Sequence, residues 1–254
     1  MNNDRLLYRR GILQLVASGF FLSTAGIALR LVEQADGWQI LFYRSLALSI
    51  TILLILVFQK RSRFFDEFRG LGWNDCLLAV FLGTGFVAYV FALLYNTVAN
   101  ALFIFSCAPF VAGFLGWILL GERVATRTWL AIGVAMAGLA VMVGSELAVS
   151  RYLGTLLALW IPIAYAASII AVRRSKRDNM LVALCLAGLV AGGLSAFFVT
   201  DYALTPRDLI ISLYLGVFQV GVGFTLVVLG SRYVPAAQVG LLALVEPVLA
   251  PIWA

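Results

Sequence analysis

Residues 83–116, GTGFVAYVFALLYNTVANALFIFSCAPFVAGFLG, align with residues 221–254, GVGFTLVVLGSRYVPAAQVGLLALVEPVLAPIWA, without a gap when the chain is shifted by 138 residues. The shared positions include glycines and prolines, which are more specific than a common apolar composition. They pair Gly83 with Gly221, Gly85 with Gly223, Phe86 with Phe224, Val90 with Val228, Tyr95 with Tyr233, Ala99 with Ala237, Pro109 with Pro247 and Ala112 with Ala250. A weaker match at a shift of 143 residues pairs Gly11 with Gly154 and Arg30 with Arg173. The chain therefore contains an internal repeat.

The repeat lies in a strongly apolar chain. Apolar residues make up 63% of its 254 residues, charged residues make up 12%, and the mean hydropathy is +1.02. Soluble domains are typically about 45–50% apolar and about 25% charged, so this composition excludes a soluble fold. A bilayer-spanning helix needs about 20 mostly apolar residues. The sequence predicts an all-α membrane protein with nine such helices, at residues 11–31, 38–58, 75–94, 99–120, 127–144, 152–172, 180–200, 208–230 and 235–254.

Basic residues alternate between the two sides of this predicted helix bundle. The loops of one side carry the Lys and Arg residues near the N-terminus, in segments 60–69, 123–127 and 173–177, and at position 232. The loops of the other side carry Arg151 and Arg207. Because cytoplasmic loops hold the excess of basic residues, this pattern predicts a multi-pass inner-membrane protein with a cytoplasmic N-terminus. The net charge of +6 then reflects orientation in the lipid bilayer and indicates no nucleic-acid partner.

The repeat unit is five helices long, and because five is odd the second copy enters the membrane from the opposite side. Inverted repeats of this kind recur in secondary transporters, whose substrate site lies near the bilayer midplane between the two halves. We expect a first half at residues 1–147 and a truncated, four-helix second half at residues 148–254. If the second copy matched the first in full, it would run to about residue 282, so a tenth helix is expected to be missing.

The repeat carries motifs that resemble a known family. They are Ala108-Pro109, Leu119-Leu120-Gly121-Glu122-Arg123, Gly133 and Gly138 in the first half, and Pro235-Ala236-Ala237 through Ala243-Leu244-Val245-Glu246-Pro247 in the second. These segments resemble the EamA-type half of the drug/metabolite transporter superfamily, over nearly the whole chain. The resemblance implies ten helices in two inverted five-helix halves. It also implies movement of metabolites, amino acids or drugs, often outward, without ATP.

Glu246 is the strongest candidate for a residue of the substrate pathway. An ionisable group inside an apolar helix costs at least about 2.5 kcal/mol by insertion scales and normally faces a cavity or a partner. It could bind a proton or a cationic group, or it could cap backbone groups that Pro247 leaves free. Pro109 and Pro247 each remove a helical hydrogen bond. The resulting bends could gate the pathway or serve packing alone.

Other polar and aromatic residues inside the apolar runs are weaker candidates. Arg44 could bind an anionic solute or extend to the membrane interface. Asn100 and Gln238 are partners in the repeat and could face the cavity from opposite sides or hydrogen-bond between helices. The aromatic candidates, which could form a wall for a planar or cationic solute or simply pack, are Tyr89, Trp160 and Tyr165.

The sequence also narrows the class of activity. It contains no phosphate-binding G-x-x-x-x-G-K-[ST] loop and no His, which argues against an ATP-driven pump and against a metalloprotease. We expect no enzyme activity, no cofactor and no metal site. The expected partners are a small-molecule substrate, a proton and the lipid bilayer. An intramembrane enzyme and a structural or regulatory membrane protein remain alternatives. The substrate, direction, coupling ion and oligomeric state stay open, with a homodimer among the alternatives.

Overall fold

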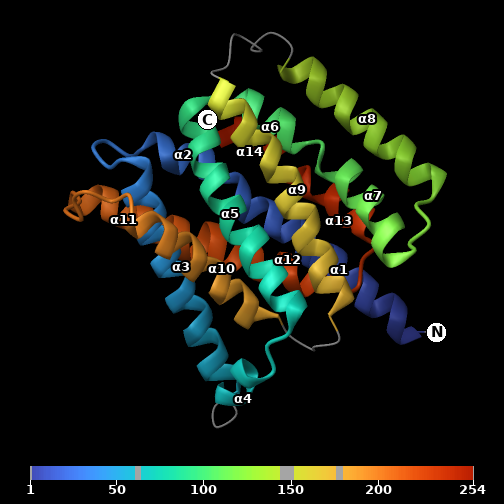
Figure 1. Cartoon of the computed structure of the whole chain (residues 1–254). Helices are drawn as coiled ribbons and strands as arrows, with labels where there is room; N and C mark the ends of the chain where they lie inside the picture. The colour runs from blue at the N-terminus through green and yellow to red at the C-terminus, as the bar shows by residue number, and fades with distance from the viewer. Residues whose placement is uncertain (1, 61–63, 144–151, 176–179, 254) are drawn as a thin grey trace.

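A computed structural model describes residues 2–60, 64–143, 152–175 and 180–253, and every regular element among them is helical (Figure 1). The first half contains α1 (Asn2–Ser23), α2 (Ala25–Arg30), α3 (Gly37–Lys60), α4 (Phe64–Arg69), α5 (Trp73–Tyr95), α6 (Val98–Phe105), α7 (Ala108–Leu120) and α8 (Thr126–Val143). The second half contains α9 (Tyr152–Arg174), α10 (Leu181–Ala196), α11 (Pro206–Tyr214), the π-helix η2 (Leu215–Val222), α12 (Gly223–Gly230), α13 (Ala236–Ala243) and α14 (Val245–Trp253). The predicted boundary between residues 147 and 148 lies outside the described residues, as do Arg61, Arg63, Arg151, Lys176 and Arg177.

Six helical segments in the described part of the chain are long and apolar enough to cross a membrane. They are Asp4–Arg30, Gly37–Gln59, Trp73–Tyr95, Asn100–Leu120, Tyr152–Arg174 and Pro206–Gly230. Two shorter apolar segments, Leu181–Ala196 and Ala236–Ala250, accompany them. Each of the nine apolar runs overlaps a helix, but the number of membrane spans stays a prediction. Large apolar side chains such as Phe58 and Val134 point outward, which suits a lipid environment.

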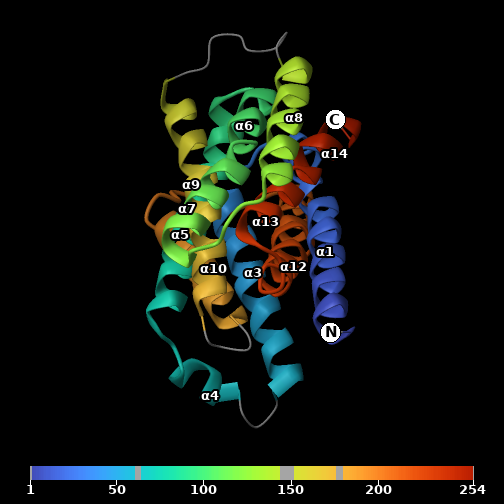
Figure 2. The same cartoon turned by 90° about the vertical axis from the view of Figure 1, so that its right-hand side faces the viewer.

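The helices of the two halves pack against each other in corresponding pairs. In one set, α5 lies along α9, α10 contacts α5, and α7 contacts α9. In the other, α12 lies along α1, η2 contacts α3, and α14 contacts α1. Two further contacts between the halves are those of α3 with α10 and of α7 with α13. Helix α8 lies at the outside, beside α6 and α13, and is at the front of Figure 2.

Pro109 and Pro247 stand in the first turns of helices rather than in helix interiors. The segment 98–120 is divided at Ser106 and Cys107, so Pro109 is the second residue of α7. The segment 236–253 is divided at Leu244, and Pro247 is the third residue of α14. Proline is tolerated in a first turn because its missing N–H has no partner within the helix there. The two prolines therefore begin new helices after a break, whereas the sequence suggested bends within continuous helices.

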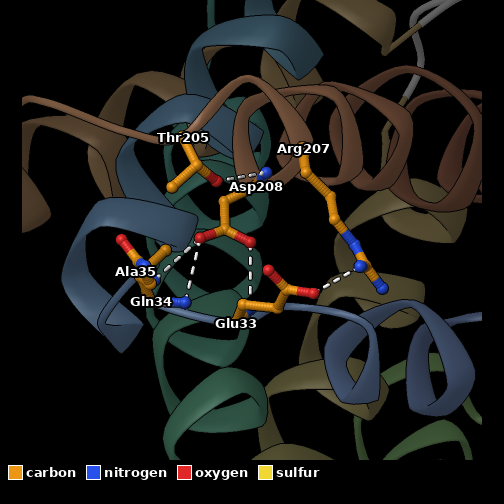
Figure 3. A network of polar contacts seen from close by, with 6 residues as sticks. All are labelled: Glu33, Gln34, Ala35, Thr205, Arg207 and Asp208. Atoms are coloured by element: carbon orange, nitrogen blue, oxygen red, sulfur yellow. Dashed lines mark hydrogen bonds and ion pairs between the residues drawn. The ribbon is translucent and has the colours of Figure 1, made fainter.

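One polar cluster joins the halves at the start of α11, which lies at the left of Figure 1. The buried carboxylate of Asp208 accepts hydrogen bonds from the backbone N–H groups of Glu33, Gln34 and Ala35, each at 3.0 Å (Figure 3). Beside it, Arg207 pairs with the side chain of Glu33. One carboxylate thus supplies the acceptors for three consecutive N–H groups in the α2–α3 loop. We call Asp208 and this loop the α11 cluster.

Replacing Asp208 with asparagine is expected to destabilise the α11 cluster by about 1–3 kcal/mol, because an amide offers one acceptor oxygen where the carboxylate offers two. Hydrogen exchange at the amides of Glu33, Gln34 and Ala35 should become at least about 5-fold faster. The control is Asp201→Asn, since Asp201 is exposed and its carboxylate accepts from the backbone N–H of Ala203, two residues along the chain. Equal exchange rates in the wild type and the Asp208 variant would contradict the assigned role.

A second polar cluster joins the halves at the end of α7, on the right of Figure 1. Glu122 pairs with Arg173 at the end of α9, and its other oxygen accepts from the backbone N–H of Ala236, the first residue of α13, at 2.9 Å. Arg173 also donates to the backbone carbonyls of Ser231, at 3.1 Å, and of Val234. Gly121 ends α7 in a left-handed conformation, with φ of 67°, that glycine adopts without strain. We call these contacts the Glu122 cluster; they give Gly121 and Glu122 of the Gly-Glu-Arg motif a structural role.

Candidate transport site

A small cavity lies in the interior where α3, α5, α9, η2 and α14 meet. Its volume is about 30 Å³, enough for about two water molecules. The polar side chains in its wall are Arg44, Tyr89, Tyr165, Gln219 and Glu246. The remainder of the wall is apolar and includes three phenylalanines. Residues from both the first and the second half of the chain contribute to the wall.

Glu246 enters the cavity from the first turn of α14, directly after the break at Leu244. Its side chain is buried, with 4% exposed. The hydroxyl of Tyr89 on α5 donates to its Oε1 at 2.7 Å, which joins the two halves across the cavity. A carboxylate near a helix N-terminus also benefits from the free N–H groups there. The sequence suggested that this carboxyl is functional, and the structure places it in the cavity with Tyr89.

Arg44 enters the same cavity from α3 and is 2% exposed, so it does not extend to the membrane interface. Its guanidinium lies over the ring of Phe86, 5.5 Å from the ring centroid, which is a favourable cation–π distance. It is close enough to Glu246 and Tyr89 to interact electrostatically with both. Within the described part of the chain, its Nη1 has no hydrogen-bond partner. Arg44 therefore keeps a free donor at the cavity.

Gln219 is the polar member of the cavity that sequence reasoning missed. It lies on η2, is 2% exposed, and its Oε1 has no hydrogen-bond partner among the described residues. Short π-helical segments within α-helices frequently mark functional sites. The sequence could have indicated this residue, because its amide is a polar group inside the apolar run 208–230, and a polar group inside an apolar run was the criterion that selected Glu246. The π-helical geometry that directs this amide into the cavity has no such signal.

The remaining candidates divide between the cavity and other places. Tyr165 lines the cavity and packs edge-on against Phe105 and Phe224. Trp160 instead donates its indole N–H to Thr84 at 3.1 Å and is not part of the cavity wall as described.

Asn100 and Gln238 lie at helix starts outside the cavity wall. The side chain of Asn100 donates to Asn96 at 2.9 Å, near the start of α6. Gln238 accepts from the hydroxyl of Tyr8 at 2.7 Å, near the start of α13. The structure therefore brings together Arg44, Tyr89, Tyr165 and Glu246, and it leaves the two amides apart from them.

Comparisons with known proteins agree with this architecture. Residues 9–144 and 152–254 match the EamA-like transporter family. One similar solved structure, described only as the crystal structure of a protein, is 19% identical and aligns with a TM-score of 0.76 over 99% of this chain and 87% of that chain. At this identity the likeness shows the fold alone. No curated protein matches the chain.

The apolar helical fold and the family match define a multi-pass membrane transporter of the drug/metabolite transporter superfamily. More particularly, the chain belongs to the EamA-like transporter family.

Proposed function

We propose that this protein is a secondary transporter that exports small metabolites by alternating access and does not act as an enzyme. The observation that carries the proposal is the pair of buried charged residues, Arg44 and Glu246, in one small cavity between the halves. Buried ionisable groups in membrane helices are costly and mark substrate or ion pathways. A cavity of about 30 Å³ is too small for a metabolite. Transport therefore requires the halves to move apart on one side at a time.

The inverted repeat is supported by two features, the bounds of the helices and the contacts between them. A shift of 138 residues superimposes the bounds of α6, Val98–Phe105, on those of α13, Ala236–Ala243, so both repeats break their helix at the same place. The helix contacts are also equivalent in the two repeats. The contact of α5 with α9 corresponds to that of α12 with α1, and the contact of α7 with α9 corresponds to that of α14 with α1. We propose nine spans in two inverted halves on this basis. Rocking about the α3–α10 and α7–α13 contacts would expose the cavity alternately.

The orientation follows from the basic residues near the Glu122 cluster. Arg123, Arg127, Arg173 and Arg174 lie at that side of the molecule, where α7 and α9 end and α8 begins. Because basic residues gather on the cytoplasmic side, we propose that the Glu122 cluster faces the cytoplasm, with the N-terminus on the same side. The α11 cluster then faces the opposite side of the inner membrane. Each cluster then joins the halves at one end of the proposed pathway.

Glu246 is the proposed proton site. Its carboxyl group is enclosed in a largely apolar cavity, which favours a neutral group, while Arg44 nearby favours a charged one. Movement of Arg44 or entry of a solute changes that balance. Glu246 can therefore bind a proton in one state and release it in another, which couples solute movement to a proton gradient without a cofactor.

The test is solute flux through purified protein in proteoliposomes, with and without a proton gradient. The panel contains amino acids, polyamines and cationic drugs, and orientation-sorted vesicles separate export from uptake. We expect a proton gradient to accelerate flux in the wild type. Glu246→Gln retains an acceptor for Tyr89 and should lower that acceleration at least about 10-fold. The control is Glu33→Gln, which changes an exposed carboxyl outside the cavity.

Two results would contradict the proposal. If no solute crosses with folded wild-type protein, the transporter assignment fails. If Glu246→Gln and Glu246→Ala both transport like the wild type, Glu246 has a structural role only and the proton site lies elsewhere.

A further inference from the structure

Two buried side chains in the cavity have complementary free hydrogen-bonding atoms. Nη1 of Arg44 is a donor without an acceptor, and Oε1 of Gln219 is an acceptor without a donor, among the described residues. Both side chains are 2% exposed, and both line the same cavity. Leaving such a group unpaired in the interior costs about 1–3 kcal/mol each, and more for a charged group. Native interiors pair nearly all of their polar atoms, so these two are prepared for a ligand or for water.

The backbone holds the two side chains in fixed relation. At Gly216 on η2, an added Cβ would lie 2.4 Å from the carbonyl oxygen of Arg44 itself and 2.5 Å from the Cβ of Ala47. Helix α3 and η2 are therefore in direct backbone contact beside the cavity. The π-helix sets the direction in which Gln219 leaves this contact. Arg44 and Gln219 therefore reach the cavity from two helical segments that are in direct contact, one from each half of the chain.

The rest of the cavity defines what such a ligand must look like. Tyr89 already donates to Oε1 of Glu246, so that oxygen has a partner before any solute binds. Phe86, Phe105 and Phe224 supply an apolar wall. The free donor of Arg44 suits an anionic oxygen, because a guanidinium binds carboxylates through its planar N–H groups. The free acceptor of Gln219 requires a hydrogen-bond donor on the same ligand.

We infer that Arg44 and Gln219 form a subsite for a carboxylate whose neighbouring carbon carries a hydrogen-bond donor, with the apolar remainder of the solute against the aromatic wall. The inference rests on the proposed transport function and gives it a substrate class. A 2-hydroxy carboxylate and a 2-amino carboxylate both offer this chemistry. An ammonium group would gain an additional attraction to Glu246 in the same cavity.

The experiment compares four solutes that share one branched apolar body: leucine, leucate, isocaproate and isoamylamine. They carry, respectively, a carboxylate with an ammonium group, a carboxylate with a hydroxyl group, a carboxylate alone and an amine alone. Flux in proteoliposomes and thermal stabilisation of the purified protein are measured for each. We expect leucine or leucate to be preferred over isoamylamine by at least about 10-fold, since a site built to hydrogen-bond a group discriminates against its absence. Preference between leucine and leucate identifies the donor.

Two variants test whether Gln219 and Arg44 cause the preference among these solutes. Gln219→Met keeps the volume and removes the acceptor, so it should lower flux of leucine and leucate about 10-fold while leaving isocaproate unchanged. Arg44→Lys keeps the charge but not the planar donor group, so it should raise KM for every carboxylate in the set. Gly193→Ala is the control, because nothing lies within 4 Å of the added Cβ.

The inference is overturned if isoamylamine is moved or bound as well as leucine and leucate. It is also overturned if Gln219→Met alters thermal stability but no selectivity, since the free atoms then hold water only. Transport of polyamines or cationic drugs without any of the carboxylates would refute the subsite and leave the transporter assignment standing. Failure of every solute would refute both.

Discussion

Gly216→Ala is expected to lower the free energy of unfolding by about 1–3 kcal/mol, because the new methyl group overpacks a close backbone contact. Its Cβ would lie 2.4 Å from the carbonyl oxygen of Arg44 and 2.5 Å from the Cβ of Ala47. Helix α3 and η2 must therefore separate, and Arg44 moves with its helix. We expect transport to fall at least about 10-fold even in the folded fraction, since small misplacements of binding groups are costly.

The measurement combines thermal unfolding of purified protein with flux in proteoliposomes. Gly193→Ala on α10 receives the same methyl group with no neighbour within 4 Å and should behave like the wild type. A Gly216→Ala protein with unchanged stability and flux would show that the α3–η2 contact is looser than the structure has it.

Glu122→Ala is expected to lower the free energy of unfolding by about 2–4 kcal/mol, because it leaves the N–H group of Ala236 without its acceptor and Arg173 without its carboxylate partner. The side chains of Glu122 and Arg173 are each only 19% exposed, so water replaces the lost contacts poorly. The loss also removes a polar contact between α13 and the end of α7. We therefore expect the variant to be more accessible to thiol reagents at an introduced cysteine beside the cavity, as well as less stable.

Glu33→Ala supplies the control for this second variant. Its ion pair with Arg207 involves side chains that are each 54% exposed, and exposed pairs contribute about 0–1 kcal/mol. The backbone N–H of Glu33 that binds Asp208 is not changed. If the two alanine variants unfolded at the same temperature, the Glu122 cluster would be no more important than a surface ion pair.

Sequence reasoning identified the helical membrane fold because apolar runs of spanning length carry that information directly. It also named Glu246 and Arg44 as separate candidates, and both side chains line the same cavity although they are about 200 residues apart. A carboxyl or guanidinium group inside an apolar run can be recognised in the sequence without knowing how the helices are arranged. Tyr89 and Tyr165 were chosen among many aromatic residues, and the cavity contains both.

Other parts of the site could not be predicted from residue type and spacing. Gln219 reaches the cavity from a π-helix, whose i→i+5 hydrogen bonds change the face on which each side chain lies. Asn100 and Gln238 occupy equivalent repeat positions, but each finds a polar partner near a helix start instead. The prolines lie next to helix breaks. Each break falls a few residues before its proline, and that position depends on packing. Repeats predict where helices correspond, while local hydrogen bonds decide where side chains point.

The size of the cavity has a further consequence for the cell. A space of about 30 Å³ holds too few water molecules to form a continuous chain across the membrane. In this state the cavity gives ions no continuous aqueous path, so many copies of the protein can lie in a membrane without the ion leak that an open channel would cause.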